Sequence, residues 1–276
     1  MLNRLFITTI LVTIFTNCNA QYYYKDLLNG TEVKKELLAL KKANIHLVKI
    51  NSYEPGGDPT ADFFCEKKIN KDFNKVTVQS KSPESGESLM ISKFDENVQL
   101  IETYDSSEIV VSENHFSYNQ NHLLTNILSI SKSNDDDFKT EIYEEHIYHY
   151  DSAFNPTDLQ IVKNKKDTLL ILFSLDEKKK VSVEKDTKTA FKYYYYYDEK
   201  ERITDIVHSN AYTQKPVVDY VFEYNTNGEI VTMTSAANNP YNTLIWKYDY
   251  ENGLRVKERA FSGDQKFLGK IEYSYK

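Results

Sequence analysis

The chain has 276 residues, of which 41 are acidic and 34 are Lys or Arg, and its formal net charge is −7 at pH 7. A mildly acidic chain without a basic cluster lacks the electrostatic surface that nucleic acid or an anionic membrane requires, so neither is an expected partner. Tyrosine (22) and phenylalanine (14) are abundant, whereas glycine (8) and proline (6) are rare. This composition excludes a disordered chain and favours β-strands.

Residues 1–20 have the pattern of a bacterial-type secretion signal. Arg4 supplies a basic n-region, residues 5–15 form an uncharged apolar run, and Cys18 and Ala20 satisfy the small-x-small rule for cleavage before Gln21. The run is shorter than the roughly 20 residues that span a bilayer, so we expect a removable signal. The mature chain of 276 − 20 = 256 residues is then exported, as a periplasmic or secreted protein.

Cys18 allows a second interpretation, in which it is lipidated and the protein is a membrane-anchored lipoprotein. The preceding residues 15–17 (Phe-Thr-Asn) differ from a lipobox, which has a smaller aliphatic residue first and Gly, Ala or Ser last, so cleavage after Ala20 is favoured. In both cases Cys65 has no intramolecular disulfide partner. We expect Cys65 to be a buried structural thiol and not a nucleophile.

The first expected element after the signal is a helix from Thr31 to Asn44, with Val33, Leu37 and Leu40 on one stripe. Thr31 is the expected N-cap, and Asn44 the expected stop. Short β-like runs follow at residues 45–50, 75–78, 89–94, 98–103 and 108–111, separated by turn-rich pieces. Residues 21–112 are thus expected to form one helix and an irregular β region.

From residue 113 onward an internal repeat recurs, consisting of an aromatic residue, any residue, a tyrosine, and then Asp or Asn. The central tyrosines of the full copies are Tyr118, Tyr150, Tyr197, Tyr224 and Tyr248, and a half-copy ends the chain at residues 273–275. The alternation of the aromatic pair predicts a strand, and Asn-Gly at residues 227–228 and 252–253 predicts hairpin turns. The expected fold class is all-β, an antiparallel hairpin meander over residues 113–276 with one short N-terminal helix.

These copies resemble the tyrosine-aspartate (YD/RHS-type) repeat, whose units look like Tyr-Asp-x-x-Gly-Arg-Leu. Residues 224–230 match with Asn for Asp and Glu for Arg, and residues 197–203 match except for Glu201 in place of Gly. The resemblance implies antiparallel sheets in exported bacterial proteins, and it favours a surface or binding module over an enzyme. The closed shells of large toxins with such repeats need many more units than this chain holds, so a closed shell is not expected.

No pattern in the sequence predicts catalysis or a metal site. His146 and His149 fall on opposite faces of an expected strand, so they cannot share a metal ion. Residues 135–137 (Asp-Asp-Asp) lack the alternating order of a calcium loop and are interpreted as a solvated loop. The sequence contains no nucleophile elbow and no phosphate loop, and no catalytic residue, metal or cofactor is expected.

One segment is a candidate binding site, and it consists of Tyr193, Tyr194, Tyr195, Tyr196 and Tyr197. Alternation places Tyr194 and Tyr196 on one face and the other three on the opposite face. If one face is core, the other can be an exposed ladder that stacks on sugar rings or partner chains. The alternative is cross-strand pairing of tyrosines within the sheet.

Three functions remain open at this point. The preferred one is a non-catalytic cell-envelope or secreted module that binds glycan or an envelope protein through the tyrosine-rich face. The second is a secreted polysaccharide hydrolase, which would need two carboxylates with separated pKa values in a deep cleft. The third is a purely structural surface protein.

Overall fold

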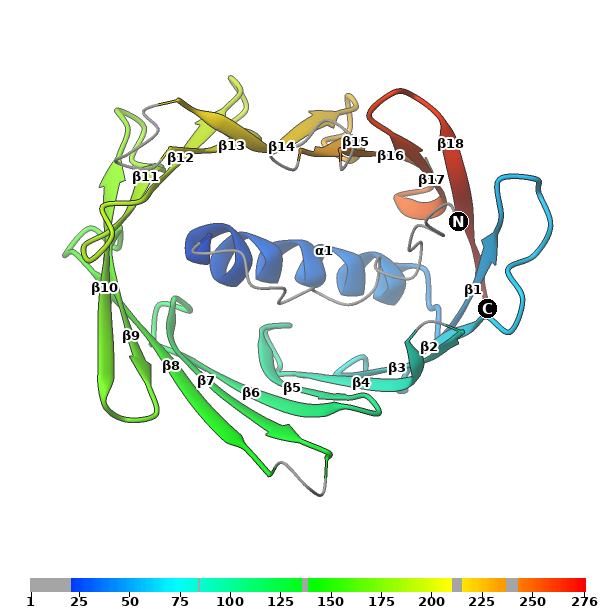
Figure 1. Cartoon of the computed structure of the whole chain (residues 1–276), viewed down its shortest axis with the longest axis horizontal. Helices are drawn as coiled ribbons and strands as arrows, with labels where there is room; N and C mark the ends of the chain where they lie inside the picture. Colours follow the sequence, from blue (N-terminus) through cyan, green and yellow to red (C-terminus); the bar gives the residue numbers. More distant parts are fainter. Residues whose placement is uncertain (1–20, 84, 136–138, 210–214, 237–242) are drawn as a thin grey trace.

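The computed structural model of the chain is a closed antiparallel β-barrel with a helix inside it (Figure 1). The structure describes residues 21–83, 85–135, 139–209, 215–236 and 243–276. A π-helical segment, η2 (Tyr23–Leu28), continues directly into α1 (Asn29–Lys42). We call η2 and α1 together the plug helix. None of the described helices is long and apolar enough to cross a membrane.

Eighteen strands are described, and they follow one another around the barrel. In chain order they are β1 (Leu47–Tyr53), β2 (Phe64–Ile69), β3 (Lys75–Ser82), β4 (Gly86–Phe94), β5 (Leu100–Ser106), β6 (Val110–Tyr118), β7 (Leu124–Ser133), β8 (Glu141–Tyr150), β9 (Pro156–Lys163), β10 (Asp167–Leu175), β11 (Val181–Asp186), β12 (Lys192–Tyr197), β13 (Ile203–Ser209), β14 (Val217–Tyr224), β15 (Ile230–Ser235), β16 (Leu244–Glu251), β17 (Leu254–Ser262) and β18 (Phe267–Tyr275). The boundary expected after residue 112 falls within β6.

The first and last strands close the barrel. β1 pairs with β18 from Val48 opposite Tyr275 to Tyr53 opposite Lys270, and it pairs with β2 on its other side. Every described strand therefore has two hydrogen-bonded neighbours, and the sheet has no free edge. The sequence leaves open whether the sheet closes, and the structure shows a closed barrel, for which hairpins without the tyrosine motif supply additional strands.

Side chains alternate between the lumen and the outer wall. On β10, Ile171 and Phe173 are buried in the lumen, whereas Leu170 and Leu172, which alternate with them, are exposed. Charged residues pair across the outer wall, as in the ion pair between Lys93 on β4 and Glu102 on β5 at 2.7 Å. The hydrophobic core therefore lies inside the barrel, where apolar side chains of the wall meet the plug helix.

The plug helix lies within the ring of strands (Figure 1). At one end, the ring of Tyr23 packs against Phe173 on β10 and Tyr195 on β12, with ring centroids 6.0 and 5.2 Å apart. At the other end, Leu37 and Leu40 are buried in a cluster with residues of β1, β2 and β3. The helix is thus part of the core of the barrel.

The helix begins earlier than the sequence predicts. Thr31 is the third residue of α1 and not an N-cap, and its hydroxyl donates to the carbonyl of Leu27 at 3.3 Å. The aromatic residues before it join the helix because wall residues contact them, a tertiary effect that local propensity does not contain. The predicted end is close to the observed one, since α1 ends at Lys42 and Asn44 has a positive φ of 54°.

The hairpin turns of the repeat share one geometry. In each, an Asp or Asn side chain accepts the backbone N–H groups of the residues two and four positions later, and the residue three positions later has a positive φ. This holds for the predicted copies at Asn119, Asp151, Asp198 and Asn225. The Asn-Gly turn at residues 252–253 is also confirmed, with positive φ at both positions.

The same turn occurs at Asp95 and Asp176, where the sequence motif is missing. Phe94 and Leu175 stand there in place of the motif tyrosine. The turn at Asp176 divides the longest gap between the predicted copies into two intervals, 176 − 151 = 25 and 198 − 176 = 22 residues. The structural repeat is therefore more regular than the sequence motif, and it begins before residue 113.

Cys65 on β2 is buried with Val48 and Ile50 in the core at the C-terminal end of the plug helix. Burial raises the pKa of its thiol to about 11, so the thiol stays protonated at neutral pH. The prediction of a structural cysteine is confirmed.

Candidate functional site

The five candidate tyrosines lie on β12, between β11 and β13. Tyr193 and Tyr195 are buried in the lumen, and the hydroxyl of Tyr197 donates to the carbonyl of Val181 at 2.7 Å. Tyr194 and Tyr196 face outward, and Tyr196 is 52% exposed. The segment is thus divided between the core and the outer wall.

The inward tyrosines have structural roles. The hydroxyl of Tyr195 donates to Oε2 of Glu184 at 2.7 Å, and its ring packs edge-on against Tyr23 of the plug helix. Tyr193 packs against Phe191 at a centroid distance of 5.2 Å. Because these groups are buried and paired, a ligand has no access to them.

The outward tyrosines belong to an apolar strip on the outer wall. In the register of the sheet, Tyr194 lies opposite Val183 of β11 and Val207 of β13, and Val207 lies opposite Val218 of β14. Residues directly opposite each other in antiparallel strands are side-chain neighbours on one face. Val207 itself is buried, and we call Val183, Tyr194, Tyr196 and Val218 the outer tyrosine strip.

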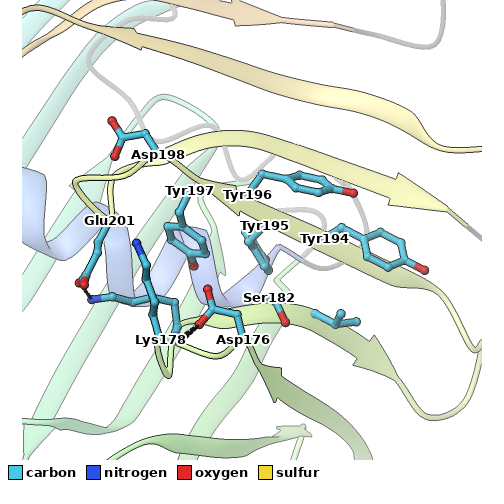
Figure 2. A pocket seen from close by; sticks show the side chains of 11 residues that line it. Asp176, Lys178, Ser182, Tyr194, Tyr195, Tyr196, Tyr197, Asp198 and Glu201 are labelled. Atoms are coloured by element: carbon cyan, nitrogen blue, oxygen red, sulfur yellow. Dashed lines mark hydrogen bonds and ion pairs between the residues drawn. The ribbon is translucent and has the colours of Figure 1, made fainter.

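A shallow depression of about 330 Å³ borders this strip, where the β10–β11 and β12–β13 turns approach each other (Figure 2). An ion pair of 2.9 Å between Lys180 and Glu201 joins the two turns. Figure 2 shows the rings of Tyr194 and Tyr196 extending in one direction, whereas Tyr195 turns away from them. The depression has the size of a small ligand site, with aromatic rings on one side and charged groups on the other.

The acids of the depression are already engaged in the fold. Asp176 and Asp198 accept the N–H groups of their own turns. Hydrogen bonds from the side chain and backbone of Arg202 lower the pKa of Asp198, so this carboxyl is a poor proton donor. Among the described residues, no group of three or more His, Cys, Asp or Glu side chains is arranged to hold a metal ion.

A second set of polar residues anchors the plug helix. Nδ1 of His146 on β8 lies 2.6 Å from Oδ2 of Asp26 in η2, and Nε2 lies 2.8 Å from Glu144. Tyr148 also donates its hydroxyl to Asp26 at 2.7 Å. Burial lowers the pKa of His146, but Asp26 and Glu144 outweigh burial and raise it to about 9. Sequence patterns do not reveal this cluster, because Asp26 and His146 are 120 positions apart.

The other anchor is Glu184 on β11, which is 1% exposed. Its carboxylate accepts the backbone N–H groups of Tyr22 at 3.2 Å and of Tyr23 at 3.0 Å. Burial raises the pKa of Glu184 to about 7. A raised carboxyl pKa is a feature of glycosidase acids, but this carboxyl is buried and accepts hydrogen bonds from the plug helix.

His149 lies on the outer face of β8, where it contacts Asp158 at 2.7 Å, away from His146 in the lumen. The two histidines do not share a site. Cys18 and the acids at residues 136–137 lie outside the described residues.

No protein-family model matches the chain, and no curated protein matches it in sequence. Similar solved structures include the TcdB2-TccC3 complex without its hypervariable C-terminal region, at 11% identity over 84% of this chain and 14% of that chain, with a TM-score of 0.37. A Photorhabdus luminescens Tc holotoxin pore has 11% identity over 78% of this chain and 16% of that chain, with a TM-score of 0.32.

 A porin-like protein from Bacteroides uniformis has 10% identity over 84% of this chain and 98% of that chain, with a TM-score of 0.33.

The chain spans less than a sixth of the toxin component without its hypervariable region. With TM-scores this low, these likenesses carry no inference about function. The resemblance to YD/RHS-type repeats therefore rests on the motif and on the recurring turns at Asn119, Asp151, Asp198 and Asn225.

Proposed function

We propose that this protein is an exported, non-catalytic β-barrel module that binds glycan on the outer tyrosine strip. The observation that carries the proposal is the outward pair Tyr194 and Tyr196, which lies beside a depression lined by Lys178, Lys180 and Glu201. Sugar rings present apolar C–H faces and polar hydroxyl edges. A site for them therefore combines aromatic rings with nearby charged or polar groups.

The barrel supports this role by holding β12 rigidly. Tyr195 and Tyr197 on the same strand are fixed in the lumen by hydrogen bonds to Glu184 and to the carbonyl of Val181. Outward side chains on such a strand have little backbone freedom to lose when a ligand binds. Less ordering on binding leaves more of the contact energy as affinity.

The test is a binding measurement on the purified mature protein with a panel of soluble bacterial and plant polysaccharides. We expect at least one polysaccharide to bind, and the double variant Tyr194→Ala/Tyr196→Ala to weaken that binding about tenfold or more, because each aromatic contact is worth roughly 1 kcal/mol. The matched control is Phe154→Ala, which removes an exposed ring on the β8–β9 turn and leaves the strip intact.

Thermal unfolding of each variant shows whether the barrel is preserved. Absence of binding to every polysaccharide, or equal loss in the double variant and in Phe154→Ala, would contradict the proposal. Capture of a purified envelope protein that depends on Tyr194 and Tyr196, without any glycan binding, would assign the strip to a protein partner instead.

A further inference from the structure

Among the described residues two carboxylates are fully buried in the barrel, and they differ in their partners. Glu258 on β17 is 0% exposed and forms an ion pair with the guanidinium of Arg255 at 2.8 Å. Glu184 on β11 is 1% exposed, and among the described residues no Lys, Arg or His forms an ion pair with it. An ionised carboxylate that is buried without a counter-charge is strongly unfavourable. A cation beside Glu184 would therefore stabilise its ionised form.

Among the described residues, the hydrogen-bond partners of Glu184 include no cation. Its hydrogen-bond partners are the N–H groups of Tyr22 and Tyr23 and the hydroxyl of Tyr195, all uncharged. The nearby carboxyl of Asp26 raises the pKa of Glu184 further. The histidine closest to Asp26 is His146, which is already paired with Asp26 and Glu144.

The residue before Tyr22 belongs to the same first turn of the plug helix. Gln21 is buried, and its carbonyl accepts the N–H of Lys25 at 2.9 Å, as in the first turn of a helix. The first N–H groups of a helix have no partner within the helix and point in one direction. Tyr22 and Tyr23 both donate to Glu184, and Gln21 is the next residue toward the N-terminus, about 3.8 Å from Tyr22 between Cα atoms.

The sequence places a cleavage site at this residue, since Cys18 and Ala20 satisfy the small-x-small rule for a cut before Gln21. We propose that a peptidase hydrolyses the bond between Ala20 and Gln21, and that the new amino group of Gln21 forms an ion pair with Glu184 inside the barrel. Water adds across the amide, leaving a carboxylate on Ala20 and an amine on Gln21. The amine takes up a proton to become the ammonium that Glu184 lacks.

Processing and folding are then linked. In the uncleaved chain the nitrogen of Gln21 is an uncharged amide, and seating the plug helix buries Glu184 without a counter-charge. After cleavage, placing the plug helix in the lumen forms an ion pair with Glu184. This ion pair favours the folded barrel with the helix inside. The Gln21 side chain also hydrogen-bonds Asp219 on β14, which holds residue 21 against the wall.

The first experiment identifies the amino terminus of the protein recovered from its host, by intact mass and N-terminal sequencing. We expect a free amine on Gln21. A chain that starts at acylated Cys18, or at a Gln21 cyclised to the uncharged lactam, would overturn the proposal.

The second experiment is a double-mutant cycle in urea unfolding. It compares chains that start at Gln21 with chains that retain Asn19 and Ala20, each with Glu184 and with Glu184→Gln. We expect the two extra residues to raise the unfolding equilibrium constant about tenfold or more when Glu184 is present, and far less with Glu184→Gln. Glu258→Gln is the matched control, in which the full effect of the extension is expected to persist.

An equal effect of the extension with Glu184 and with Glu184→Gln would overturn the proposal. If Glu184→Gln does not fold, aminopeptidase digestion provides a second test. It compares the chain that starts at Gln21 with the chain that retains Asn19 and Ala20, both with Glu184. The buried amine of Gln21 is expected to resist digestion, whereas rapid removal of Gln21 from the folded protein would contradict the ion pair.

Discussion

The hydroxyl of Tyr197 on β12 donates to the carbonyl of Val181, the first residue of β11, at 2.7 Å. The same contact recurs between Tyr224 and Ile203 at 2.8 Å and between Tyr150 and Leu124 at 2.7 Å. In each case a tyrosine at the end of one strand binds the start of the strand before it. The repeat thus uses its tyrosine to fix the end of the barrel where the Asp and Asn turns lie.

This role predicts that Tyr224→Phe destabilises the barrel, because it leaves the carbonyl of Ile203 without its hydroxyl donor. The expected loss is about 1 kcal/mol in the free energy of unfolding, measured in urea. Tyr196→Phe removes a hydroxyl from an exposed ring, and we expect a change below about 0.5 kcal/mol. Equal losses in the two variants would show that the hydrogen bond contributes nothing specific.

The contact between Asp26 and His146 predicts a larger effect. Both side chains are less than a tenth exposed, and Asp26→Asn leaves a buried imidazolium without one of its two carboxylates. We expect a loss of about 3 kcal/mol in unfolding free energy, as for the breaking of a buried pair. His149→Ala, which breaks the exposed contact to Asp158 on the outer wall, is the control and is expected to change stability by less than about 1 kcal/mol. A similar small change for Asp26→Asn would contradict the anchoring role.

The pKa shifts predict how stability depends on pH. His146 has its pKa raised from 6.5 to about 9, so its contribution is complete below pH 6.5 and is lost as pH rises through 9. Glu144 has its pKa lowered from 4.5 to about 2, mainly by the hydrogen bond from His146, so its contribution is complete above pH 4.5 and is lost as pH falls through 2. We expect maximal stability between these limits, in urea unfolding measured from pH 2 to 10.

Glu184 makes this profile depend on the amino terminus. Burial raises its pKa from 4.5 to about 7, and a carboxyl with a raised pKa stabilises the fold below pH 4.5 and loses that contribution as pH rises through 7. A chain that retains Ala20 is expected to lose stability between pH 4.5 and 7. A chain that starts at Gln21 is expected to lose much less there, because the ammonium favours the ionised carboxylate. Identical profiles for the two chains would contradict the ion pair.

The sequence predicts those features that depend on local chemistry. The strand alternation of residues 193–197 and the turns at Asp151 and Asp198 follow from the side chains at those positions. The motif does not predict the turn at Asp176, because Leu175 stands in place of the tyrosine, although the acid that forms the turn is present. The seating of the plug helix and the partners of Glu184 cannot be predicted in this way, because they join residues 161 and 162 positions apart.

The closed barrel raises the question of whether the wall is stable without the helix. Leu40 is 2% exposed and packs in the core with Val48 and Ile50, whereas Leu38 on the same helix is 43% exposed. If the helix is part of the core, Leu40→Ala leaves a cavity and lowers the unfolding free energy by about 2–5 kcal/mol. Leu38→Ala removes the same atoms from a solvent-exposed position and is expected to change it by less than about 0.5 kcal/mol. A small effect of Leu40→Ala in urea unfolding would mean that the eighteen strands hold together without the helix, and that the helix occupies the lumen as a separable segment.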